Sequence, residues 1–156
     1  MKKAFSLIEL FIAITLMGLM AVLFLNYTNY SFFSNQATKT TIQTQFSSIT
    51  QALLHCKSLS DAFPVANDTL ISDLECPTDP PYSIDGYDGF FAPVAPSGFS
   101  AYKAYHSGSE FYIQTSVESS SDLVQIVQDL AQNYSNNQYE YETQGGVVVA
   151  RYYISR

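Results

Sequence analysis

The chain has 156 residues, a formal net charge of −7 and only 13% charged residues. This length allows one globular domain and a membrane anchor but excludes two full domains. The acidic balance argues against direct binding of nucleic acids, because it repels their phosphates. The sequence has no nucleophile elbow, phosphate-binding glycine loop or zinc-binding helix motif, so we expect neither an enzyme nor a cofactor.

The N-terminal stretch combines two basic residues with a long apolar run. Lys2 and Lys3 precede a run that extends from Phe5 to Leu25 and contains one acidic residue, Glu9. About 20 apolar residues in a helix cross a bilayer core, and a carboxylate inside it costs roughly 2.5–3.5 kcal/mol or more. The two lysines favour a cytoplasmic N-terminus. We therefore expect a transmembrane helix over residues 5–25, with a functional role for Glu9.

The string Lys2-Lys3-Ala4-Phe5-Ser6-Leu7-Ile8-Glu9-Leu10 resembles the processing site of type IV pilins and of the pseudopilins of type II secretion. The resemblance implies a leader of residues 1–4, which a prepilin peptidase removes between Ala4 and Phe5, and N-methylation of Phe5. It also implies that Glu9 acts in assembly. In a filament, the Glu9 carboxylate would meet the α-amino group of Phe5 on a neighbour, because an unpaired charge in an apolar core is costly.

Three simpler explanations compete for residues 5–25. A cleaved secretory signal has a shorter apolar region and a small-residue cleavage site. A plain single-pass anchor accounts for the length but leaves Glu9 and the string around it unexplained. A buried core helix is usually shorter and less uniformly apolar.

The next stretch has the pattern of an amphipathic helix. Ile42, Phe46, Ile49 and Leu53 recur at spacings of four, three and four, which places them on one helix face. We expect one continuous helix from about residue 5 to about residue 55. Its second part, residues 26–56, belongs to the globular domain and packs beneath a sheet.

Residues 57–100 read as a long loop, because all six prolines of the chain fall there. Cys56 and Cys76 should form a disulfide across this loop, worth roughly 3 kcal/mol in the chain-entropy model. Asp79, Asp85 and Asp88 surround two glycines and are weak calcium candidates, although a solvated turn explains them more simply. Type IVa major pilins usually carry their disulfide near the C-terminus, which argues against a typical major pilin.

The last third of the chain predicts two hairpins and a helix. The hairpins cover residues 102–117 and 139–154, with Ser-Gly-Ser and Gly-Gly turns. A helix near 121–134 lies between them, after a Ser- and Asp-rich cap. The nearly all-apolar Val147-Val148-Val149 indicates a central strand that is covered on both faces. Residues 57–156 thus form the loop and sheet of a pilin-like α+β domain, in which a mainly antiparallel sheet packs on the long helix.

Together these features predict a structural subunit of a type IV pilus or type II secretion filament, a minor pilin or pseudopilin. We expect it in the inner membrane with a periplasmic domain, and later in a cell-surface or periplasmic filament. The implied partners are the prepilin peptidase, other pilin or pseudopilin subunits, the inner-membrane assembly platform and the membrane. A permanently membrane-anchored periplasmic binding module and a competence pseudopilin that aids DNA uptake remain alternatives. The sequence does not choose between pilus, secretion and competence systems.

Overall fold

The computed structural model describes residues 7–133 and 138–155. The chain divides into two compact units, a first unit of Met1–Ala37 and a second unit of Thr38–Arg156. The elements follow in the order α1 (Leu7–Ser60), β1 (Asn67–Leu70), η1 (Ile71–Asp73), β2 (Glu75–Cys76), β3 (Tyr82–Ser83), η2 (Tyr87–Gly89), β4 (Lys103–Ser107), β5 (Glu110–Glu118), α2 (Val124–Asn133), β6 (Tyr139–Gln144) and β7 (Val147–Ser155), where η marks a 3-10 helix.

The long N-terminal helix is present, but its predicted membrane span is wrong. Within residues 7–133 and 138–155, no helix combines the length and the apolar character that a membrane crossing requires. The physical reason is that polar residues limit the apolar run at both ends. Glu9 and Asn26 enclose fewer than the about 20 apolar residues that a bilayer core needs. The transmembrane part of the predicted fold and the predicted inner-membrane location with a periplasmic domain are therefore corrected.

The α+β class and the mainly antiparallel sheet are confirmed. Five strands pair in the order β1-β4-β5-β7-β6, and β2 and β3 form a separate two-stranded sheet. Every pair is antiparallel. Both predicted hairpins are found, as β4–β5 and β6–β7. Val148 and Val149 are consecutive and both buried, so β7, an interior strand between β5 and β6, is covered on both faces there.

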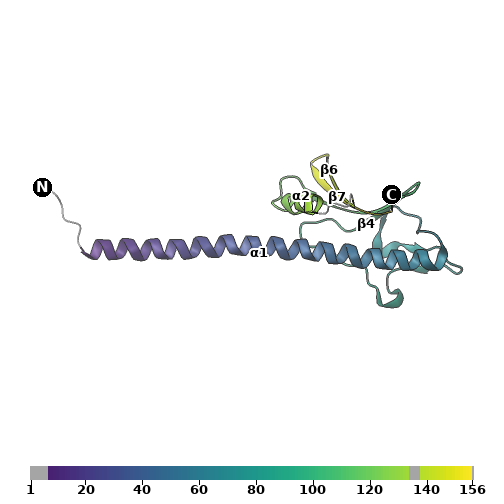
Figure 1. Cartoon of the computed structure of the whole chain (residues 1–156), viewed down its shortest axis with the longest axis horizontal. Helices are drawn as coiled ribbons and strands as arrows, with labels where there is room; N and C mark the ends of the chain where they lie inside the picture. The colour runs from purple at the N-terminus through teal and green to yellow at the C-terminus, as the bar shows by residue number, and fades with distance from the viewer. Residues whose placement is uncertain (1–6, 134–137, 156) are drawn as a thin grey trace. The chain divides into compact units, whose positions relative to one another are not determined.

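The core of the second unit lies between the C-terminal half of α1 and the five-stranded sheet, which Figure 1 shows along one side of that half. The α1 face that the spacing predicted is fully buried, and it consists of Ile42, Phe46, Ile49 and Leu53. Strand β5 alternates strictly, so that every second residue from Phe111 to Val117 points into the core. The Phe46 ring lies 5.3 Å from Tyr102 and 5.4 Å from Tyr152, measured between ring centroids.

Two local predictions need adjustment. The helix expected near 121–134 is α2, and the Ser121 hydroxyl accepts a hydrogen bond from the Leu123 amide at its start. The loop expected over residues 57–100 contains the strand β1, which pairs with β4 at the edge of the sheet and is followed directly by the 3-10 turn η1. Pairing with a partner strand outweighs the local preference for a turn.

Candidate functional site

The α1 stretch from Phe11 to Phe24, which we call the uncovered segment, is apolar and exposed on all sides. Successive helical residues point about 100° apart, so a run of exposed apolar residues leaves no polar face. Ten large side chains here are between 53% and 76% exposed, and they are Phe11, Ile12, Ile14, Leu16, Met17, Leu19, Met20, Val22, Leu23 and Phe24. A helix that is apolar all round is normally buried. This exposed apolar surface is a candidate interaction site.

The one hydroxyl of the uncovered segment is already satisfied within its own helix. Thr15 Oγ1 donates to the backbone oxygens of Phe11 and Ile12, at 3.0 and 2.9 Å. Burial in apolar surroundings therefore leaves no side-chain hydrogen bond unmade, which would otherwise cost several kcal/mol. At Gly18, an added Cβ would meet no atom of the described residues within 4 Å, so no contact among them requires glycine there.

The residues of the predicted processing site fall mostly outside the described part of the chain. Lys2, Lys3, Ala4 and Phe5 lie before residue 7, where the description begins. Glu9 lies in the first turns of α1. The pairing of its carboxylate with the amino group of Phe5 on a neighbour stays a prediction.

The predicted disulfide is confirmed. Cys56 and Cys76 are joined with an S–S distance of 2.09 Å and a Cα–Cα distance of 5.6 Å, and both residues are buried. The bond connects the C-terminal part of α1 to β2. It fixes the start of the proline-rich loop against the helix.

The three calcium candidates are not brought together. The Asp85 carboxylate accepts a hydrogen bond from the Ala92 amide at 2.6 Å and so closes the loop around η2. Asp88 lies inside η2 with a φ of 49°. Over residues 7–133 and 138–155, no three His, Cys, Asp or Glu side chains are placed to hold a metal ion together. Asp79, Asp85 and Asp88 therefore form no cation site in the described structure.

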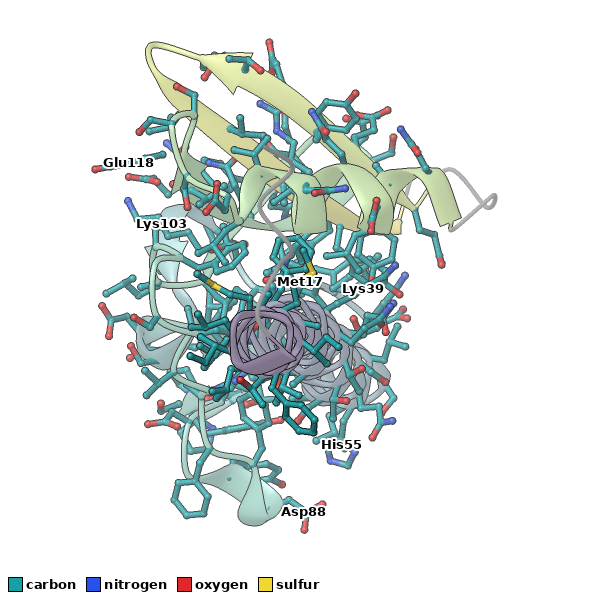
Figure 2. All side chains as sticks on the ribbon, turned by 90° about the vertical axis from the view of Figure 1, so that its left-hand side faces the viewer. Met17, Lys39, His55, Asp88, Lys103 and Glu118 are labelled. Carbon is teal, nitrogen blue, oxygen red and sulfur yellow. A yellow bond between two sulfur atoms is a disulfide. The ribbon has the colours of Figure 1, made fainter. Side chains whose placement is uncertain are left out.

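A groove between α1 and the loop around η2 was not predicted from the sequence. This α1–η2 groove has a volume of about 350 Å³ and is lined by Ser48, Gln51, Ala52, His55, Tyr82, Ile84, Tyr87, Asp88, Gly89 and Phe90. Figure 2 shows its labelled members His55 and Asp88 on the side of α1 that faces away from the yellow strands β6 and β7. The only sequence signal is the spacing of residues 48, 51, 52 and 55, which places them on one helix face.

Tyr82 and Tyr87 form the aromatic wall of this groove. Their rings stack with centroids 3.9 Å apart and planes 25° apart. The Tyr82 hydroxyl is buried and has no hydrogen-bond partner among the described residues. Burial raises the pKa of Tyr82, and the neighbouring Tyr87 adds to the rise.

A charged cluster lies at the β1 edge of the sheet. Lys103 Nζ is 2.9 Å from both carboxylate oxygens of Asp68, and the Tyr105 hydroxyl donates to the same carboxylate. The bonds from Tyr105 and then Lys103 lower the pKa of Asp68. Burial, followed by the bond to Asp68, raises the pKa of Tyr105 to about 12. The opposite charges of Lys103 and Asp68 pair with each other, and this pair links β4 to β1.

Comparisons of the chain with protein-family models, with curated proteins and with solved structures found no match. The resemblance to pilins and pseudopilins therefore rests on the N-terminal residues of this chain. The features that bear on function are these N-terminal residues, the uncovered segment and the α1–η2 groove.

Proposed function

We propose that the protein is a structural subunit of a filament of the type IV pilus or type II secretion kind, in the role of a minor pilin or pseudopilin. In such a filament, the uncovered segment packs against the corresponding helices of neighbouring subunits. The observation that carries the proposal is the exposure of apolar side chains on every side of α1 between Phe11 and Phe24. A large exposed apolar surface marks an interaction site.

The free energy gained by burying these apolar side chains is large enough to offset the cost of association. Burying one large apolar side chain completely contributes roughly 1.5–3 kcal/mol. Even half of that value for each of the ten exposed side chains matches the cost of association, about 4–15 kcal/mol. The hydrophobic effect alone can therefore hold the segment among its neighbours.

The distribution of the apolar side chains favours many neighbours over one. A single partner helix in a two-fold dimer covers one side of the segment and leaves the rest in water. Complete burial needs helices on several sides. Repeated head-to-tail contacts that do not close into a ring generate helical filaments. A bundle of staggered copies, or of companion subunits with similar helices, satisfies both requirements.

Processing at the N-terminus is part of the same proposal. Lys2 and Lys3 place two positive charges just before the helix, and unpaired charges are costly in an apolar core. Cleavage by a prepilin peptidase between Ala4 and Phe5 removes both charges and creates the amino group that Glu9 of a neighbour can meet. N-methylation of Phe5 follows by the resemblance.

Mass spectrometry of the N-terminal peptide tests the processing step. The full chain is expressed with and without a prepilin peptidase. We expect a peptide that starts at Phe5, with or without an added methyl group, only when the peptidase is present. The variant Ala4→Gly, which carries the residue usual in the family, is the positive control. An intact N-terminus for the natural chain in both strains, with Ala4→Gly cleaved, would contradict the proposal.

A further inference from the structure

The α1–η2 groove is independent of the uncovered segment and lies entirely within the second unit. Its floor is one face of α1, with Ser48, Gln51 and His55, and its opposite wall is the loop from Tyr82 to Phe90. Its volume of about 350 Å³ falls at the lower end of the range for small-ligand sites, roughly 300–1,000 Å³. A ligand of this site must therefore be small.

The wall of the groove is held in place before any ligand arrives. The Gly86 amide donates to the Phe90 oxygen at 2.8 Å, and the Phe90 amide donates to the Tyr87 oxygen at 2.9 Å. The carboxylate of Asp85 closes the same loop from the other side through the Ala92 amide. A wall that is already ordered loses little conformational entropy on binding.

Tyr87 offers an aromatic platform. Tyr82 stacks on its ring, and Tyr87 as a whole remains 41% exposed. The His55 ring lies 6.1 Å away, measured between centroids. The groove therefore combines a single apolar ring surface with polar groups opposite it.

Besides the tyrosine hydroxyls, four polar side chains line the groove without a hydrogen-bond partner among residues 7–133 and 138–155. They are the hydroxyl of Ser48, the amide of Gln51, the imidazole of His55 and the carboxylate of Asp88. These groups supply both donors and acceptors. Neither Lys nor Arg lines the groove, and Asp88 together with the net charge of −7 opposes an anionic ligand.

We propose that the α1–η2 groove binds a neutral saccharide of one or two sugar units. A sugar ring has an apolar C–H face that fits the Tyr87 platform, and its hydroxyls both donate and accept hydrogen bonds. A quaternary ammonium ligand is the alternative that an aromatic site with a carboxylate suggests, but it is best held by ring faces on several sides. Here Tyr82 and Tyr87 cover each other, which leaves one platform.

Amide NMR of the full chain tests this site. The protein is kept in a polyoxyethylene detergent, because detergents with sugar or choline headgroups would compete. Maltose, cellobiose and N,N′-diacetylchitobiose are titrated in turn, with choline chloride as the rival probe. We expect saturable shifts of the Gly86–Phe90 amides with at least one disaccharide. Tyr87→Ala should weaken that binding about tenfold or more, and Gln51→Ala should weaken it less.

The controls separate binding from folding. Leu54→Ala changes an exposed α1 residue that does not line the groove and should leave the affinity unchanged. Tyr87→Phe keeps the ring and should retain binding. The proposal is overturned if none of the three disaccharides gives saturable shifts, if only choline does, or if Tyr87→Ala binds as tightly as the natural chain while its spectrum shows a folded domain.

Discussion

The two halves of α1 are both rich in apolar residues but differ in how those residues are arranged. Between Ile42 and Leu53 the large apolar side chains keep to one face, and they are at most 1% exposed beneath the sheet. Between Phe11 and Phe24 they occupy every face and are at least 53% exposed. When apolar residues form a stripe on one face of a helix, the rest of the same chain can cover that face. When they occupy every face, other molecules must cover the remaining faces. One helix thus contributes to folding in one half and, by our proposal, to assembly in the other.

The same substitution in each half should separate these two roles most clearly. Phe46→Ala removes a fully buried ring and should lower the free energy of unfolding by about 3–5 kcal/mol. Phe11→Ala removes a ring that is 66% exposed and should change it by about 0.5 kcal/mol or less. Denaturant titration of the full chain in detergent, followed by circular dichroism, measures both. Equal losses for the two variants would mean that the halves of α1 do not differ in the way described here.

A smaller effect should appear at high pH, and it arises in the second unit, where Tyr105 lies in strand β4. The pKa of Tyr105 is raised to about 12, and a tyrosine in the unfolded chain titrates near about 10. Between these values the unfolded chain releases the proton while the folded chain keeps it. The free energy of unfolding should therefore be unaffected by this group below about pH 10 and fall as the pH rises toward about 12.

Tyr105→Phe should reduce this fall without abolishing it, because burial also raises the pKa of Tyr102. Denaturant midpoints measured at intervals from about pH 9 to about pH 12 give the slope. Tyr141→Phe, at an exposed position on the edge strand β6, is the control for adding a phenylalanine to the sheet. An unchanged slope in Tyr105→Phe would show that the hydroxyl titrates alike in the folded and unfolded chains.

The sequence was sufficient where the signal is local or strictly periodic. The Gly145-Gly146 turn and the alternation along β5 define the hairpins, and the four-three-four spacing defines the buried face of α1. The disulfide was predicted because the chain has two cysteines, Cys56 and Cys76, one at each end of a loop. Each of these patterns admits few alternative structures.

The sequence was insufficient where a structure depends on residues far apart in the chain, or where a prediction depends on a minimum length of apolar helix. The membrane span was overestimated because the count began before Glu9, so the run seemed longer than it is. The strand β1 depends on β4, which lies more than thirty residues later. The α1–η2 groove joins a helix face to a loop that no local pattern connects with it.

The most direct test of the account is photo-crosslinking from the uncovered segment. Met17 is its most exposed large side chain, at 76%, and Met17→p-benzoylphenylalanine places a reactive ketone there in the full chain expressed in its own cells. We predict crosslinks to apolar N-terminal helices of other copies or of companion filament subunits, identified by mass spectrometry. The same probe at Leu54 should not give these products. Crosslinks from position 17 that reach no protein would contradict the claim that neighbouring helices cover this segment.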